Sequence, residues 1–336
     1  MKTETYITSM KAPRMMHGLI VRSTITHGTI VSLNIPPLSE DFLVITAKDI
    51  LGSNAVKVLS STFQLLAGDH IIYKGQPILA VFGPDPEAVS IAAAQIAVHY
   101  KETPPEELPT DTVFMKKELS WGDTDTLFAE AEETVELAYL TGTQSSRNTT
   151  PAGAFTQMLE DRLIVHASAQ WPFHVRNTIS ETCGVAKRKV LVYQNSYYPT
   201  QDEKLIYPSV YAALAALTTL RSGRPARLID DTPAYRPEMI VTRKTALDKN
   251  RAPLAETVDI QVNQGAIPLF TKELLEQVTA GAAPMYGLKA CRITAQVLQT
   301  PASPRNHFTG LGASLALFSS EAHASTLAAS SGISPA

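Results

Sequence analysis

The sequence is poor in the residues that build disulfides and metal clusters. Its two cysteines, Cys183 and Cys291, lie far apart among 336 residues. A disulfide framework needs several cysteines at short spacings, and an iron–sulfur cluster needs about four thiolates. This chain alone therefore supplies neither a disulfide scaffold nor a multi-cysteine zinc or iron–sulfur site.

The usual spacings of catalytic and metal-binding motifs are also missing. None of the eight histidines forms an H-x-H, H-x-x-x-H or H-E-x-x-H pair, the spacings that place two imidazoles on one metal ion. The sequence has no G-x-S-x-G nucleophile turn and no Walker-type phosphate loop. We therefore predict no metal ligands and no catalytic residues of a hydrolase or P-loop enzyme in this chain.

Long apolar runs and blocks of like charge are absent as well. The net charge is −3, from 29 basic and 32 acidic residues, and no basic stripe suggests a nucleic-acid or membrane partner. No run of about 18 apolar residues indicates a membrane span, and the first residues, MKTETYITSM, lack the apolar region of a signal peptide. The sequence predicts a cytoplasmic globular protein.

Strand and helix signals are interspersed along the whole chain. This pattern predicts an α/β or α+β fold in at least two domains. We expect a first domain over 1–102, a proline-rich linker over 103–123 and a second domain over 124–336. One clear helix signal in the first domain is Asp85 followed by Pro86, a capping residue before a favoured first helical position.

The second domain contains further regular segments. We predict a helix over 172–183 stopped by Gly184, a buried strand over 189–193 and a strong helix over 207–222. Another helix is expected over 314–329. The segment between the strand and the strong helix, SYYPTQDE, is bulky and acidic where a ligand loop would usually be rich in glycine.

Two short features could hold a ligand. Gly310 and Gly312 precede an apolar helix, and a glycine turn before a helix N-terminus suits an anion such as phosphate. Gln170 lies at a strand end, where its amide could both donate to and accept from a cofactor. The simpler alternatives are a tight turn packed backbone to backbone and a solvated polar residue.

Segments spread along the chain share their order and spacing with one known family. They read MMHGLIVRSTITHGTIVSLNI, IIYKGQPILAVFGPDPEAVSIAAAQIAVHYKE, VHASAQWPFHVRNTISETCGVAKRKVLV, LRSGRPARLIDD and FTGLGAS. Each resembles a segment of the molybdenum-binding subunit of the xanthine dehydrogenase and aldehyde oxidase family. The resemblance runs over nearly the whole chain.

The resemblance implies a fold and a chemistry. The fold is an N-terminal hammerhead-like α/β domain followed by the first part of an α+β molybdopterin-binding domain. The chemistry is hydroxylation of a heterocycle or an aldehyde with water-derived oxygen at a molybdenum–molybdopterin cofactor, for which the protein supplies orientation and electrostatics. The implied partners are a chain with the second half of this subunit, which holds the general base, and subunits that carry the 2Fe–2S clusters and FAD.

The same resemblance gives candidate cofactor-binding residues. Gln170 stands in the family's Ser-x-Gln-x-Pro segment, and Lys204 stands at the lysine of its Gly-Gly-Gly-Phe-Gly-Gly-Lys-Glu loop. The Phe-Arg-Gly-Phe-Gly loop corresponds to the segment before the last helix. The full set of candidates is Gln170, Lys204, Gly310, Gly312 and Ala313.

The glycine loop of the family falls on 197–205, and there the sequence departs from the family. Pro199 lacks an N–H and restricts φ, and Asp202 and Glu203 would place negative charge near an anionic pterin. Leu205 replaces a glutamate that faces the substrate, and Thr309 replaces the arginine of the Phe-Arg-Gly loop. We therefore expect the fold to be retained better than the cofactor site.

Three functions remain open from the sequence. The first is a component of a molybdenum hydroxylase that needs a partner chain. The second is a structural or assembly paralogue that has lost the cofactor. The third is an unrelated small-molecule binding module on a similar scaffold.

Overall fold

The structure is a computed structural model that describes residues 6–108, 112–145, 151–195, 203–230, 235–305, 310 and 312–332. The chain forms two compact units, each with its own buried core. Unit 1 comprises Met1–Leu108, Arg147–Ala234 and Pro301–Ser303. Unit 2 comprises Pro109–Ser146, Tyr235–Thr300 and Pro304–Ala336.

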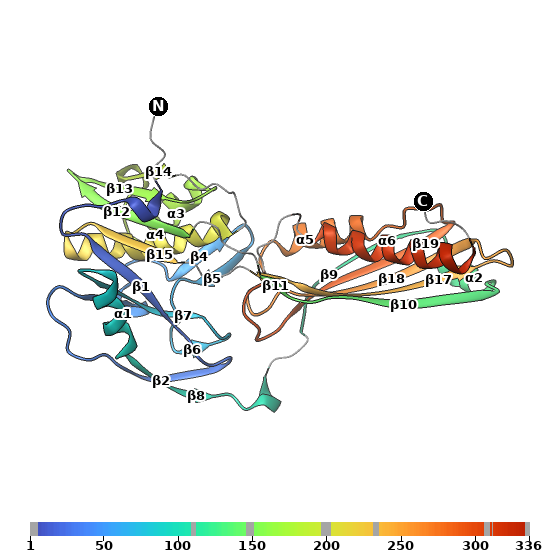
Figure 1. The fold of residues 1–336 in the computed structure, drawn as a ribbon, viewed down its shortest axis with the longest axis horizontal. Helices are drawn as coiled ribbons and strands as arrows, with labels where there is room; N and C mark the ends of the chain where they lie inside the picture. The colour runs from blue at the N-terminus through green and yellow to red at the C-terminus, as the bar shows by residue number, and fades with distance from the viewer. Residues whose placement is uncertain are drawn as a thin grey trace. The chain divides into compact units, whose positions relative to one another are not determined.

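Unit 1 is built on a mixed seven-stranded sheet (Figure 1). In spatial order its strands are β14 (Val190–Gln194), β13 (Arg162–Ala167), β12 (Ala152–Leu159), β15 (Ala226–Asp230), β1 (Met16–Arg22), β7 (Pro77–Gly83) and β3 (Leu43–Thr46). In the middle of the sheet β1 pairs in parallel with β15 and antiparallel with β7. Segments from the two ends of unit 1's sequence therefore share one sheet.

Unit 1 also contains smaller sheets and short 3-10 turns. The strands are β6 (His70–Ile71), β2 (Gly28–Asn34) and β8 (Ala97–Glu102) in one sheet, and β4 (Ala55–Val58) and β5 (Ser61–Gln64) in a hairpin. The 3-10 turns are η1 (Ile7–Ser9), η2 (Ala47–Asp49), η3 (Pro105–Glu107) and η4 (Lys187–Lys189). A core of apolar side chains lies between these strands and the first helix.

The helices of unit 1 follow the sequence signals closely. Helix α1 (Pro86–Ala94) begins at Asp85, whose carboxylate accepts a hydrogen bond of 2.9 Å from the Ala88 N–H, as predicted. Helix α3 (Pro172–Cys183) ends at Gly184, whose φ of 68° is the left-handed conformation that favours glycine. Helix α4 (Glu203–Ser222) packs against α3 and β12. Since α4 is apolar around most of its circumference, it is almost entirely buried.

Unit 2 is a five-stranded sheet with its two longer helices on one face (Figure 1), and a short helix packs against alternate positions on the other face. Its strands, in spatial order, are β10 (Glu133–Thr141), β17 (Glu238–Leu247), β18 (Pro253–Asn263), β19 (Ala290–Gln299) and β9 (Thr112–Trp121). The helices are α2 (Thr124–Ala129), α5 (Thr271–Gly281) and α6 (Ala313–Ser330), and β11 (Gln144–Ser145) pairs with β16 (Tyr235–Arg236). Alternate residues of the sheet pack against α5 and α6, so their neighbours along each strand face away from the core.

The structure differs from the sequence predictions at several places. Residues Thr112–Trp121, predicted as part of a linker, form the edge strand β9. Contacts group 147–234 with the N-terminal residues in unit 1, and the domain limits expected from the sequence stay a prediction. The strand near 189–193 is β14, an edge strand rather than a buried one, with Tyr193 half exposed.

Across the residues that the structure describes, no helix combines the length and the apolar character that crossing a membrane would require.

Candidate functional site

Gln170 lies in a short connection between β13 and α3. The strand ends at Ala167, and Trp171 and Pro172 begin the helix. Two hydrogen bonds hold this connection: the Gln194 side chain donates to the Ala169 carbonyl at 2.7 Å, and the Gln170 N–H donates to the Lys204 carbonyl at 2.9 Å. The structure therefore places Gln170 beside the first turn of α4.

A proline in α4 explains why the Lys204 carbonyl can accept this bond. In a regular helix that carbonyl would accept from the N–H four residues later, which is position 208. Pro208 lies inside the helix and has no N–H to donate. The carbonyl left over by Pro208 accepts the Gln170 N–H instead, so both backbone groups are paired inside the protein.

Lys204 itself is oriented into the protein. Its side chain has 0% exposure, and it lies in α4 rather than in a loop. The predicted cofactor loop 197–205 is thus shorter than expected, since 203–205 are helical. The part of this loop at 197–202 lies outside the described residues.

The other candidates form the N-terminal turn of α6. Gly310 and Gly312 have φ angles of 82° and 86°, a backbone conformation that L side chains rarely adopt. Gly310 is exposed, and a Cβ added to it would meet nothing within 4 Å. Gly312 is buried, and the Ala313 N–H is already engaged by the Gly310 carbonyl at 2.9 Å. Thr309 lies outside the described residues.

The candidates therefore form two groups. Gln170 and Lys204 are joined by a hydrogen bond in unit 1, and Gly310, Gly312 and Ala313 form one turn in unit 2. Their role in cofactor binding stays a prediction.

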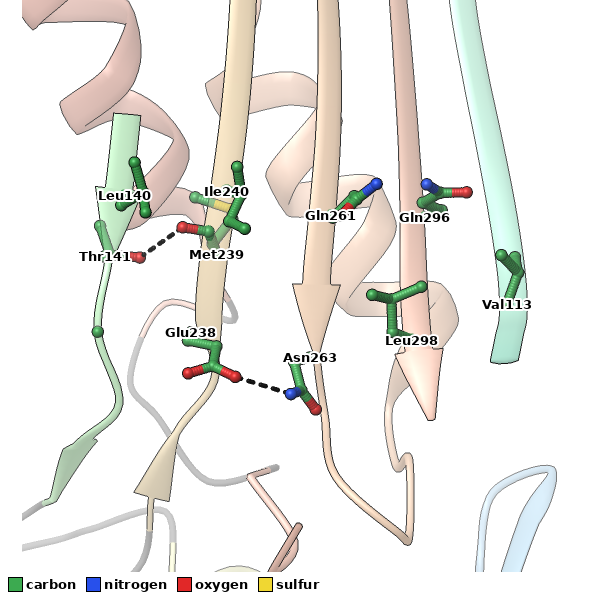
Figure 2. A pocket seen from close by; sticks show the side chains of 11 residues that line it. Val113, Leu140, Thr141, Glu238, Met239, Ile240, Gln261, Asn263, Gln296 and Leu298 are labelled. Carbon is green, nitrogen blue, oxygen red and sulfur yellow. Dashed lines mark hydrogen bonds between the residues drawn. The ribbon is translucent and has the colours of Figure 1, made fainter. Parts of the chain in front are cut away.

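Unit 2 also contains a polar hollow that the sequence did not predict (Figure 2). It has a volume of about 560 Å³ and lies on the face of the sheet turned away from α5 and α6. Amide side chains contribute to it from neighbouring strands, and apolar side chains lie at its ends. Among its lining residues are Gln261, Gln296, Asn263, Leu140, Ile240 and Leu298.

A carboxylate at the edge of this hollow is held by several partners. Glu238 accepts a hydrogen bond of 2.7 Å from Asn263 and forms an ion pair of 2.6 Å with Arg305. Burial alone would raise the pKa of Glu238, but the hydrogen bond and charge of Arg305 lower it below its usual value. The carboxylate stays ionised, and the positive charge of Arg305 balances it. The hollow as a whole therefore has the chemistry to bind a polar, uncharged group.

The sequence did contain a signal for this hollow. In β18 and β19 polar residues alternate with buried apolar ones, and the two strands pair in parallel with Gln261 opposite Gln296. A strand with period-two alternation presents its polar residues on one face. The pairing of the strands, which brings the two amides together, could not be read from either strand alone.

A buried charged network lies on the other face of the same sheet. Arg243 and Glu256 are 1% and 0% exposed and form an ion pair of 2.5 Å. Arg243 also donates to the Ala282 carbonyl and to Ser320, both at 2.6 Å, and Tyr286 donates to Glu256 at 2.5 Å. Because these bonds are internal and the charged groups have no access to solvent, the network fastens helices to sheet rather than binding a ligand.

The cysteines and the remaining titratable groups give no sign of a metal centre. Both thiols are buried, and burial raises the pKa of Cys183 and of Cys291 to about 12, which keeps them protonated. Within the described ranges, no group of three or more His, Cys, Asp or Glu side chains is arranged to hold a metal ion.

Comparison with family models gives two matches that together span most of the chain. The aldehyde oxidase and xanthine dehydrogenase a/b hammerhead domain matches residues 3–104. The molybdopterin cofactor-binding domain matches residues 105–336. Their order along the chain is the order implied by the motifs.

Individual relatives and solved structures agree with these matches. The chain is 24% identical to a probable xanthine dehydrogenase subunit of Bacillus subtilis (strain 168), over 98% of this chain and 47% of that protein. It is 26% identical to the 6-hydroxypseudooxynicotine dehydrogenase complex subunit gamma of Paenarthrobacter nicotinovorans, over 83% of this chain and 39% of that protein. Quinoline 2-oxidoreductase from Pseudomonas putida 86 superposes with a TM-score of 0.85 at 20% identity, over 98% of this chain and 46% of that chain, which establishes a common fold. The chain spans about half the length of these relatives or less.

Proposed function

This chain belongs to the aldehyde oxidase and xanthine dehydrogenase family, and we propose that it is one component of a molybdenum hydroxylase-type oxidoreductase. The reaction class is hydroxylation of a heterocycle or an aldehyde with water-derived oxygen. A partner chain would carry the second half of the molybdenum subunit, and further subunits would carry the 2Fe–2S clusters and FAD.

One observation carries this proposal: the match of a molybdopterin cofactor-binding domain to residues 105–336. The names of two relatives, a xanthine dehydrogenase subunit and a complex subunit gamma, support a role within an assembly.

The described residues fit a pterin cofactor in part. The turn at Gly310 is exposed, has open space beside its Cα, and precedes a helix of 18 residues with no acidic residue in its first turn. Such a helix N-terminus suits the phosphate of a pterin. Lys204 fits less well, because a ligand could reach its buried ammonium only if neighbouring atoms moved.

We assign two roles to residues of this chain. The side-chain amide of Gln170 would contact the cofactor, since Pro208 in α4 lets the Lys204 carbonyl fix the backbone at this position. The backbone at Gly310 and Gly312 would approach its anionic part. The bound molybdenum cofactor would supply the redox chemistry and the oxygen transfer.

The test is to isolate the complex from its own host through an affinity tag on this chain. We expect molybdenum and a pterin in stoichiometric amounts, together with a chain that carries the missing half. Elemental analysis measures the metal, and fluorescence of the oxidised pterin measures the cofactor. A fully assembled complex without molybdenum would contradict the proposal.

A variant pair makes the test specific to the site. Gln170→Ala should lower the pterin content, because it removes the proposed amide contact while leaving the backbone bond to Lys204. Gln64→Ala is the matched control, since Gln64 is an exposed glutamine in the same unit. Equal cofactor contents in the two variants would remove Gln170 from the site.

A second candidate function is a structural or assembly paralogue without cofactor. The sequence of the altered loop favours it, because Pro199 removes an N–H and Asp202 adds a negative charge where glycines would let a pterin approach. The same isolation distinguishes the two functions. An assembled complex free of molybdenum and pterin is the result expected from this second candidate.

A further inference from the structure

A second hollow, in unit 1, is lined mainly by cationic side chains. Its volume is about 360 Å³. Its charged or titratable lining residues are Lys11, Arg14, His17, Arg224 and Arg227. They come from residues 11–17, which lead into β1, and from residues 224–227, which lead into β15. The parallel pairing of β1 with β15 brings these two distant stretches together.

Hydrogen bonds to the backbone fix two of the arginines that line this hollow. Arg224 donates through Nε to the Arg14 carbonyl at 2.9 Å. Arg227 donates through one Nη to the carbonyls of Thr8 and Met10, at 2.8 and 2.7 Å. Since a guanidinium has five N–H groups, each arginine keeps further donors for another acceptor.

Arg14 has an unusual backbone conformation at the edge of this hollow. Arg14 has a φ of 56°, which is uncommon for a residue with a side chain. In this conformation its carbonyl meets Arg224 while its own guanidinium lines the hollow. A strained residue of this kind persists when the surrounding structure holds it in place, and such residues concentrate at ligand sites.

Negative charge around the hollow is scarce. Asp41 forms an ion pair of 3.2 Å with Arg224, but its own side chain is 68% exposed. Asp85 is near enough to raise the pKa of His17 slightly against the stronger lowering by burial and by Arg227. Among the described residues, no carboxylate forms an ion pair with Lys11, Arg14 or Arg227. The hollow therefore holds an excess of positive charge in a chain whose net charge is −3.

Partial burial makes the charge of Arg227 costly without a counter-ion. Burial lowers the pKa of Arg227, which means that the site disfavours its own cation. An anion in the hollow would reverse that effect, because an opposite charge a few ångströms away favours the charged form.

We propose that this hollow binds the phosphate group of a small molecule. Guanidinium forks match the oxygens of a phosphate in two-point hydrogen bonds, and the lysine adds a mobile point charge. The volume lies within the range of small-molecule sites, so there is room for atoms beyond the phosphate itself. The proposal does not depend on the function proposed above, because it concerns different residues and needs no molybdenum.

The test is isothermal titration calorimetry of the full chain with inorganic phosphate and with adenosine monophosphate, against chloride at equal ionic strength. We expect saturable binding of both phosphates over chloride. Tighter binding of the monophosphate would assign the site to an organic phosphate, and equal binding would assign it to the free ion. No saturable binding of either compound would overturn the proposal.

Matched variants separate the hollow from general surface charge. Arg14→Gln and Lys11→Gln each remove one lining cation that is exposed and free of ion pairs among the described residues, so both variants should fold. Each should weaken phosphate binding about tenfold, the usual effect of one charge-assisted bond. Arg188→Gln and Lys187→Gln, at exposed positions elsewhere in unit 1, are the controls and should leave affinity unchanged. An equal loss in the controls would overturn the proposal.

Discussion

Arg243 and Glu256 are two opposite charges placed where no water reaches them. Glu256→Gln would keep the size and most hydrogen-bonding capacity of the side chain but would leave the guanidinium of Arg243 uncompensated in the core of unit 2. We expect a loss of about 3 to 5 kcal/mol in the free energy of unfolding. Urea denaturation followed by circular dichroism measures it.

The neighbouring residue offers a control for this substitution. Lys244 forms a surface ion pair of 3.7 Å with Glu136, and both side chains are about half exposed. Glu136→Gln should change the free energy of unfolding by at most about 1 kcal/mol. A loss for Glu256→Gln no larger than that of the control would show that the buried pair contributes no more than a surface pair.

His323 should make unit 2 sensitive to acid. It lies between Tyr139 and Thr245, at 3.0 and 2.8 Å, and burial together with the charge of Arg243 lowers its pKa to about 4. An unfolded histidine takes up its proton near pH 6.5, so the unfolded state binds more protons than the folded state between about pH 6.5 and 4. Stability is therefore complete above that range and falls as the pH drops through it.

The variant His323→Gln isolates this effect from other titrating groups. It should lose less unfolding free energy than the unchanged protein on acidification from about pH 6.5 to 4, because it removes one proton-binding site from the unfolded state. Urea denaturation at several pH values gives the two curves. Parallel curves would mean that His323 does not contribute to the acid sensitivity.

Unit 2 has an edge strand that exposes several apolar side chains. Strand β9 lies at the sheet edge and exposes Val113, Phe114, Leu119 and Trp121, each by 38% to 49%. Long edge strands with apolar side chains pair readily with other chains. Phe114→Lys together with Leu119→Lys should therefore raise the protein concentration at which the isolated chain aggregates, as measured by light scattering.

The control for the β9 variant adds a charge to the strand without removing an apolar side chain. Ser120→Lys places one lysine on the same exposed strand. It should shift the onset of aggregation less than the double variant does. A shift of equal size would attribute the effect to charge alone and not to the apolar edge.

Helices and strands could be predicted where the sequence carries a local signal, such as a capping residue, a glycine stop or an alternation of apolar and polar residues. Helices α1 and α3 were predicted because Asp85 caps one and Gly184 ends the other. Helix α5 was missed, since it begins after Phe270, which has no capping side chain and a φ of 53°. Strand β9 was missed because nearly all of its residues are exposed, which leaves no alternation of buried and exposed positions to detect.

The candidate site was predictable in its local parts. Gln170 and the turn at Gly310 were found from motifs, but the hydrogen bond from Gln170 to Lys204 depends on how α4 packs against the end of β13. The hollow along Gln261 and Gln296 depends on strand pairing. Both require contacts between segments distant in sequence, which a pattern within one segment does not contain.

At the scale of the molecule, the boundary between the two family models runs through the middle of unit 1. The models meet at residues 104 and 105, yet the contacts across that boundary are extensive. The Met16 N–H donates to the Pro225 carbonyl at 2.7 Å, Arg22 pairs with Asp230, and Arg224 donates to the Arg14 carbonyl.

These contacts predict the behaviour of a cut chain. A protease site inserted between the exposed residues Glu106 and Glu107 should be cleaved without separating the fragments, because β1 stays paired with β15. Size-exclusion chromatography should show one peak, and a denaturing gel of that peak should show two fragments. Separate elution of the fragments under native conditions would contradict the prediction.

The pairing of β1 with β15 also limits how segments of such proteins can be exchanged between relatives. A chimera that exchanges residues 1–104 for those of a relative would replace β1 while keeping the β15 against which it must fit. The crossover would also separate Arg22 from the Asp230 with which it forms an ion pair. Laboratory recombination should therefore exchange unit 1 as a whole. The strands that pair in its sheet must come from the same parent protein, although they are far apart in the sequence.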